Sequence, residues 1–115
     1  MLNDSSLLDR TFHALADPTR RGILARLSRG PASVSDLARP LPMSLPAVLQ
    51  HLQALETSGL VSSEKKGRVR TVSIEPTAMN AAENWFTEQR SNWEASADRL
   101  EDYLATLQDN GESHE

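Results

Sequence analysis

The sequence contains no cysteine, which excludes disulfides, thiol redox switches and thiolate metal sites within the chain. It has no apolar run near the roughly 18 residues of a membrane-spanning helix, and its first residues do not resemble a secretory signal peptide. Aromatic residues make up only 4% of the sequence, so the core is predicted to be aliphatic. We expect a cytoplasmic protein without a membrane partner.

Catalytic motifs are also missing from the 115 residues. The sequence has no glycine-rich phosphate loop, no paired carboxylates in a catalytic context and no nucleophile with a plausible base. We therefore expect no enzymatic activity and no cofactor. A chain of this length is predicted to form a single domain, residues 1–115, with a modest core that burial against a partner would extend.

The net charge of −4 conceals an uneven distribution of charge along the chain. Residues 20–70 carry nine Lys or Arg against three acidic residues, whereas residues 71–115 carry two against ten. A basic middle joined to an acidic end produces a directed field, which favours a polyanionic partner for the basic part. A random scatter of surface charge is the alternative explanation.

Residues 43–60 carry the start and stop signals of one helix. Ser44 is a typical N-cap residue, Pro46 suits the first turn, and Gly59 can take the left-handed conformation that ends a helix. The spacing of the apolar residues predicts a buried side formed by Val48, Leu52 and Leu55.

The opposite side of this helix is small and uncharged. It is predicted to carry Pro46, Gln50, Gln53, Ala54 and Thr57, with Leu45 and Leu49 on the flank between the two sides. Amides can hydrogen-bond adenine edges in a major groove, and apolar groups can contact thymine methyls. Such a surface is more typical of a DNA-recognition helix than of an ordinary solvated helix.

Three shorter helices are predicted before this one. The first is capped by Ser5 or Ser6 and ends near Ala16, the second covers residues 17–29, and the third covers residues 33–39. Only about four residues, two of them prolines, separate the third helix from the helix of residues 44–58. So short a connection predicts the steep crossing of a helix-turn-helix.

Four arginines lie on the second of these helices: Arg20, Arg21, Arg26 and Arg29. For most of them, pairing with nearby acids or covering apolar surface is the simpler explanation. A phosphate contact by Arg20 or Arg21, which lie near the helix start, is the alternative.

Residues 60–65 and 69–74 predict two strands of a hairpin, because the second run is rich in β-branched residues and a glycine lies between them. Four cations cluster around its tip: Lys65, Lys66, Arg68 and Arg70. Beside a helix-turn-helix, such a hairpin is predicted to be a wing that contacts phosphates or a minor groove. The alternative is an exposed hairpin that its lysines keep soluble.

After Pro76 the chain has no proline, and no glycine until Gly111, which predicts one long helix over about residues 76–108. A seven-residue repeat of mainly apolar positions runs along it: Met79, Ala82, Phe86, Gln89, Trp93, Ser96, Leu100, Tyr103 and Leu107. About 32 residues extend near 50 Å, farther than a domain of this size can cover. The far part of the repeat therefore predicts a partner.

A second copy of the chain is the predicted partner, paired through this helix and the first one. The residues assigned to this dimer interface are Leu8, Phe12, Phe86, Trp93, Leu100, Tyr103 and Leu104. The polar residues 109–115 are predicted to form a flexible tail.

Taken in order, these segments resemble the ArsR-type winged-helix repressors of bacteria and archaea. The resemblance spans residues 8–74 and rests on residues 14–24 (ALADPTRRGIL), 34–38 (VSDLA), 44–61 and 67–68. It implies a winged helix-turn-helix fold, mainly α with a small β-hairpin, in which about residues 5–75 form the core and wing. It also implies a homodimer that binds an inverted repeat in double-stranded DNA and usually represses transcription, often of its own operon.

The resemblance places DNA-reading positions on Leu45, Pro46, Leu49 and Gln50, with Ser44 at the helix start and Arg68 in the wing. The full set of candidate DNA-contacting residues is Ser44, Leu45, Pro46, Ala47, Leu49, Gln50, Gln53, Lys65, Lys66, Arg68 and Arg70. Leu49 departs from the family, which usually has serine at this position. A thymine-methyl contact or a packing role would replace the hydrogen bond of the hydroxyl.

Metal sensing is not expected. Many relatives bind metals through cysteines before the recognition helix or through histidines on the last helix, but residues 32–39 contain no cysteine and residues 76–107 no histidine. The three histidines, His13, His51 and His114, share no helical i, i+4 pairing. A ligand pocket between helices is one explanation for four aromatic residues of the last helix, and the simpler one is that they belong to the core or to the dimer interface: Trp85, Phe86, Trp93 and Tyr103. The sequence leaves the effector and the operator open.

A second function class would use the same surface. A winged-helix module can bind another protein through an apolar flank, here Leu45, Pro46 and Leu49. The double change Lys66→Ala and Arg68→Ala separates the two classes, because it would weaken DNA binding on every sequence and leave protein binding intact.

Overall fold

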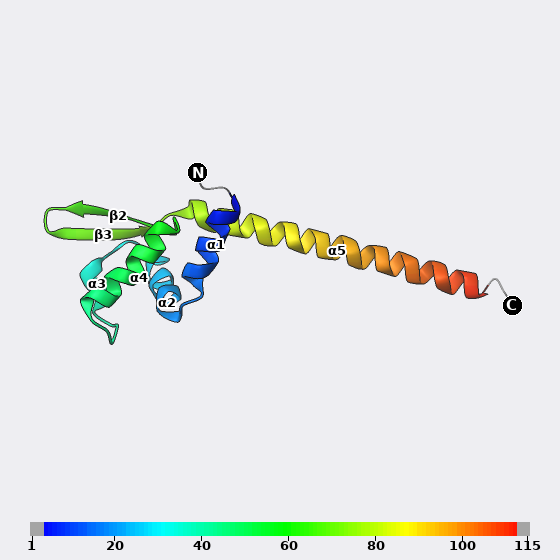
Figure 1. The fold of residues 1–115 in the computed structure, drawn as a ribbon, viewed down its shortest axis with the longest axis horizontal. Coiled ribbons are helices and arrows are strands. Elements are labelled where there is room, and N and C mark those ends of the chain that lie inside the picture. Colours follow the sequence, from blue (N-terminus) through cyan, green and yellow to red (C-terminus); the bar gives the residue numbers. More distant parts are fainter. Residues whose placement is uncertain (1–3, 113–115) are drawn as a thin grey trace. The chain divides into compact units, whose positions relative to one another are not determined.

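The computed structural model describes residues 4–112. Its helices and strands follow one another in the order α1 (Asp4–Leu15), α2 (Pro18–Leu27), β1 (Ala32–Ser33), α3 (Val34–Ala38), α4 (Leu45–Thr57), β2 (Val61–Lys66), β3 (Val69–Ile74) and α5 (Pro76–Glu112) (Figure 1). The predicted fold class, mainly α with a small β-hairpin and a long C-terminal helix, is confirmed.

Three helices begin at the N-caps that the sequence predicts. The side chains of Asp17, Ser33 and Ser44 accept hydrogen bonds from backbone N–H groups three residues further on, at 3.1, 3.1 and 3.3 Å. The predicted cap of α1 is wrong, because that helix already begins at Asp4 and so contains both Ser5 and Ser6. A serine caps a helix only when it directly precedes the first turn, and α1 begins before either serine.

The core is aliphatic, as predicted, and α4 lies at its centre. Val48 and Leu55 of α4 are completely buried and Leu52 is nearly so. Residues from the other elements of the first 82 positions pack around them, including Ala14, Ile23, Leu27, Leu37, Leu60, Val61, Val72 and Ala78. The inner side of α4 is therefore fixed by contacts with helices and strands on several sides, which determines the direction of its outer side.

The sheet has three strands in the order β1-β3-β2, all antiparallel, and its first strand was not predicted. β1 has only two residues, Ala32 and Ser33, so it is too short to show the alternation that marks a strand. β2 and β3 form the predicted hairpin, in register from Val61 opposite Ile74 to Lys66 opposite Val69. The turn is tight because Gly67 takes a positive φ of 62°.

The contacts divide the chain into two compact units, Met1–Ala82 and Glu83–Glu115. α5 contributes to both: Ala78 and Ala82 are buried in the first unit, and the helix continues to Glu112. The prediction of a flexible tail from residue 109 is therefore wrong for residues 109–112, which are helical. Glycine weakens a helix but, unlike proline, it keeps the backbone N–H that donates the helical hydrogen bond, so Gly111 does not end α5. Residues 113–115 and the predicted tail there, with His114, lie outside the described residues.

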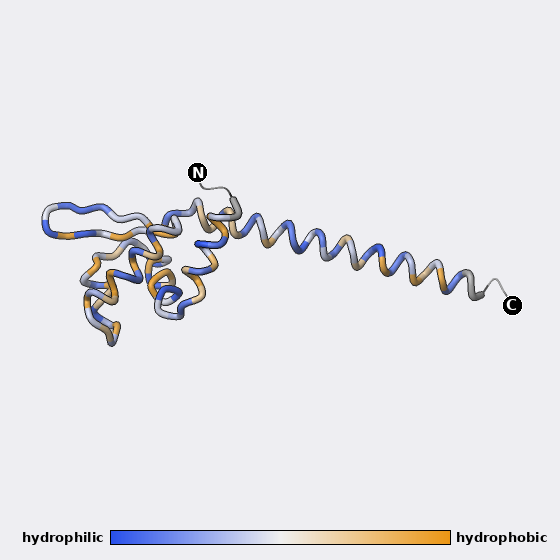
Figure 2. Tube along the Cα trace, in the orientation of Figure 1, coloured by the Kyte–Doolittle hydropathy of each residue, from blue (hydrophilic) through white to orange (hydrophobic). Residues whose placement is uncertain are grey.

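Hydrophobic residues recur along α5 between hydrophilic ones, without forming a continuous apolar segment (Figure 2). Accordingly, none of the helices within residues 4–112 is both long enough and apolar enough to span a bilayer.

Candidate DNA-binding surface

The outer side of α4 is exposed in the way that the helical spacing predicts. Pro46, Gln50 and Gln53 are exposed, whereas the residues of the opposite side are buried. The two flanking leucines are also open to solvent: 53% of Leu45 and 45% of Leu49 is exposed. Ser44 is exposed at the helix start, and Ala47 is half-buried. The candidate residues of α4 thus form one continuous, uncharged surface.

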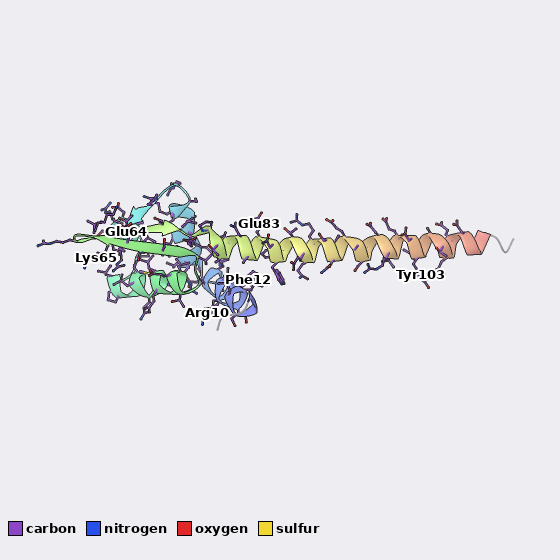
Figure 3. All side chains as sticks on the ribbon, turned by 90° about the horizontal axis from the view of Figure 1, so that it is seen from above. Arg10, Phe12, Glu64, Lys65, Glu83 and Tyr103 are labelled. Carbon is purple, nitrogen blue, oxygen red and sulfur yellow. The ribbon has the colours of Figure 1, made fainter. Side chains whose placement is uncertain are left out.

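The four cations of the hairpin are all exposed but do not share one face. Lys65 is paired with Arg70 across the two strands, so their side chains project from the same face of the sheet. Figure 3 shows Lys65 on the side of the hairpin where α4 lies, and Glu64 on the other side. Lys66, the next residue, projects with Glu64, away from α4.

A groove of about 490 Å³ separates the start of α4 from the hairpin. Leu45 and Leu49 line its helix side, and Lys65, Arg68 and Arg70 line its hairpin side. Its remaining lining residues are Ser33, Val34, Ser35 and Val69. The fold therefore brings together two residues of α4 and three cations that lie about 20 positions away in the sequence.

Arg70 is held by a short chain of hydrogen bonds. Its Nη1 donates to Ser63 Oγ at 2.9 Å, and Ser63 Oγ donates to Glu56 Oε1 at 3.2 Å. Ser63 and Arg70 belong to the hairpin and Glu56 to the last turns of α4. These two hydrogen bonds orient the hairpin relative to α4. Arg70 therefore has a positioning contact besides its predicted role as a phosphate ligand.

The other edge of α4 borders α1. A second, more open groove of about 620 Å³ lies there, lined by Gln50 and Gln53 of α4 and by Asp9, Arg10 and His13 of α1, with Ala54, Thr57 and Ser58. Figure 3 shows Arg10 on the side of the molecule where α4 lies. Arg10 was not among the predicted site residues, because nothing in the local sequence pattern relates it to Gln50; only the packing of α1 on α4 brings both to one groove.

Comparisons with known proteins agree with this geometry. A family model described as a helix-turn-helix domain matches residues 15–64. The transcriptional repressor SdpR of Bacillus subtilis is 32% identical over 79 residues, which cover 69% of this chain and 88% of that repressor. The crystal structure of the ArsR family transcriptional regulator RHA00566 is 50% identical, with a TM-score of 0.76, and the match covers 82% of this chain and 97% of the other.

The chain belongs to the ArsR family of transcriptional regulators. Its relatives are regulators and not enzymes. A further structure of this kind is the homodimeric winged helix-turn-helix DNA-binding domain Mb0332 of Mycobacterium bovis, a possible ArsR-family regulator. It is 28% identical, with a TM-score of 0.58, over 77% of this chain and 81% of the other.

In this ArsR-family chain, the first two arginines of α2 hold the end of α1. Arg20 donates through Nε to Ala14 O at 2.7 Å and through Nη2 to His13 O at 3.1 Å, and Arg21 Nη1 donates to Leu15 O at 2.7 Å. Carbonyls at a helix C-terminus lack partners within the helix, and guanidinium groups satisfy them well. The structural explanation of these two arginines therefore fits better than a phosphate contact.

Arg20 also links this helix end to α4. Its Nη1 lies 3.3 Å from His51 Nδ1, within hydrogen-bond distance, and because a guanidinium can only donate, Nδ1 is the acceptor in this contact. His51 Nδ1 lies 3.8 Å from Asp17 Oδ2. The pKa of Asp17 is lowered mainly by the hydrogen bond from the backbone N–H of Arg20; burial acts in the opposite direction, and the positive charges of protonated His51 and of Arg20 lower the pKa further.

His51 is thus part of a hydrogen-bond network between helices. Within residues 4–112, no group of three His, Asp or Glu side chains is arranged to hold a metal ion.

The second unit has an exposed apolar seam. Trp93 is 70% exposed and Leu100 57%, and the side chains of Phe86, Tyr103, Leu104 and Leu107 are exposed as well. Of the predicted interface residues, only Leu8 and Phe12, both in α1, are half-buried. The four aromatic residues of α5 that the sequence offers for a ligand pocket, Trp85, Phe86, Trp93 and Tyr103, are all exposed.

Proposed function

We propose that this protein is a homodimeric repressor that binds an inverted-repeat operator through the outer side of α4 and the hairpin. The observation that carries the proposal is the uncharged, exposed outer side of α4 beside a groove lined by three cations. An α-helix of 13 residues, about 20 Å long, fits into a major groove.

The two parts of this surface are suited to different parts of a duplex. Gln50 and Gln53 can hydrogen-bond the N6 and N7 atoms of adenine, so that they would read sequence. Lys65 and Arg68 can pair with phosphates, which sets register and adds affinity on any sequence. Arg10 and Gln50 both line the second groove, so Arg10 adds a cation at the opposite edge of α4 from the hairpin.

A dimer would cover the exposed seam of α5. Trp93 and Leu100 leave large apolar areas open to water in a single chain, which favours pairing with an identical helix. The similar Mycobacterium bovis domain is homodimeric. A two-fold pair presents two copies of α4, and this symmetry matches an inverted repeat with half-sites one helical turn, about 10–10.5 bp, or a multiple of it apart.

Repression is the proposed outcome of binding, because the similar Bacillus subtilis protein is a transcriptional repressor. We also propose that the protein represses its own operon, so that the operator lies upstream of its own gene.

A selection of bound duplexes from random sequence, followed by mobility-shift titration, tests this function. We expect a two-fold symmetric site whose affinity falls steeply with salt. The double change Lys65→Ala and Arg68→Ala should weaken binding on all sequences and lower the salt slope by about two. Arg90→Ala, which removes an exposed cation from α5, is the matched control and should change neither.

If the protein binds no duplex more tightly than random DNA at moderate salt, the proposed function is wrong. The protein-binding alternative, which the exposed Leu45 and Leu49 favour, would then be tested by partner capture with Lys66→Ala and Arg68→Ala.

A further inference from the structure

Two exposed leucines on α4 are not explained by hydrogen bonding or by phosphate contacts. Leu45 and Leu49 are four residues apart, so they lie on the same face of the helix. About half of each side chain is open to water. A single exposed leucine is ordinary, but two adjacent ones at the start of a recognition helix form a contiguous apolar patch.

The surroundings of these leucines indicate what covers them. They form one side of the 490 Å³ groove whose other side carries Lys65, Arg68 and Arg70, and none of the residues that line this groove is acidic. A partner that fits must therefore present negative charge and apolar groups together. The major groove of DNA does so, because phosphates border it and the C5 methyl groups of thymine project into it.

We propose that Leu45 and Leu49 recognise thymine through its C5 methyl group, and so determine part of the operator sequence. This inference rests on the proposed function and names the bases that this part of the surface selects. The exposure of Leu49 argues against a packing role alone, because a side chain that only filled the core would be buried, as the neighbouring Val48 is.

Helix geometry limits where these thymines lie. Four residues of helix rise about 6 Å, and base pairs are spaced about 3.4 Å apart, so the two contacted methyl groups should lie about two base pairs apart in each half-site. Gln50 follows Leu49 and can read adenine. A T·A base pair presents a methyl group on one strand and the adenine N6 and N7 atoms on the other, so both residues favour A·T-rich half-sites.

Replacement of thymine by uracil in the DNA tests the inference without altering the protein. The probe is the duplex selected by the wild-type chain, with deoxyuridine placed at one thymine position at a time. Uracil keeps every hydrogen-bonding group of thymine and lacks only the methyl group. We expect about a fourfold loss of affinity at each of two thymines per half-site, the effect of removing one buried methyl, and little change at other thymines.

Protein variants then assign the effect to the leucines. In Leu49→Ala and Leu49→Ser, uracil at one of the two positions should no longer lower the affinity, and in Leu45→Ala the same should hold for the other position. The reason is that each variant has already lost the contact with that methyl group, so removing the methyl group costs nothing more. Val69→Ala is the matched control: Val69 lines the hairpin side of the same groove and is 52% exposed. This variant should keep both uracil effects.

Two results would overturn the inference: full affinity for every uracil duplex, or uracil losses that are the same in wild type and in both leucine variants. Failure of the proposed function gives a different result. In that case the wild-type chain would not bind the unmodified duplex more tightly than random DNA.

Discussion

The two units of this chain place their apolar residues in opposite ways. In the first unit, Val48 and Leu55 are completely buried, whereas in the second, Trp93 is 70% exposed. Both sets recur at helical spacing, so the difference in exposure lies in what surrounds them. The first unit contains the helices and strands that cover its own apolar residues, and the second contains only a helix. This is why we propose that a second copy of the chain covers the seam of the second unit.

Charge separates the same regions. The basic segment, residues 20–70, lies within the first unit, and most of the acidic residues after position 70 lie on α5. A polyanion is attracted to the first and repelled by the second. In the proposed function, this division would favour DNA binding by the first unit and leave the seam of α5 to the second copy.

The largest expected effect is loss of a core side chain in the first unit. Leu55→Ala removes a completely buried side chain and should lower the free energy of unfolding by about 2–5 kcal/mol. Hydrogen exchange of the α4 amides measures this loss within the first unit. Leu107→Ala, at an exposed position of α5, should leave the exchange of α4 unchanged. Equal losses in both variants would remove the distinction between the units.

A smaller effect is expected when the seam of the second unit is shortened. Trp93→Ala should weaken dimerisation by roughly 2 kcal/mol, about thirtyfold in the dissociation constant, because large aromatic side chains contribute most to such interfaces. Sedimentation velocity over a dilution series measures it. Glu94→Ala changes the neighbouring exposed residue off the seam and is the control. An unchanged dimer in Trp93→Ala would show that the seam faces something else.

An effect of similar size, on DNA binding instead of dimerisation, is expected for a single base contact. Gln50→Ala should weaken binding to the selected operator by about 1–3 kcal/mol and relax the preference at one base pair, without altering dimerisation. Mobility-shift titration on the operator and on random DNA measures both quantities. Gln108→Ala, an exposed glutamine on α5, should have no effect. If Gln50→Ala weakens binding to both DNAs equally, Gln50 does not read sequence.

Local signals allowed the sequence to predict much of this structure. Ser33 and Ser44 are N-caps because a hydroxyl in that position meets free backbone N–H groups, and this requires only neighbouring residues. The exposed side of α4 followed from spacing alone. The hairpin and its glycine turn followed from β-branched residues around Gly67.

The features that the sequence missed depend on tertiary contacts or on very short segments. β1 has two residues, and it is a strand only because β3 lies beside it. Arg10 and Gln50 line one groove because α1 packs against α4. The hydrogen bonds from Arg70 through Ser63 to Glu56 join residues up to 14 positions apart. No pattern within one element contains this information.

The central claim is that a two-fold pair of chains reads one duplex with two copies of α4. Changing the spacing between the two half-sites of the selected operator tests it most directly. An insertion of five base pairs turns one half-site to the opposite side of the duplex, since a helical turn contains about 10 base pairs. We expect this insertion to reduce the affinity to that of random DNA. An affinity that does not change with the insertion would contradict the account, because each chain would then bind its half-site alone.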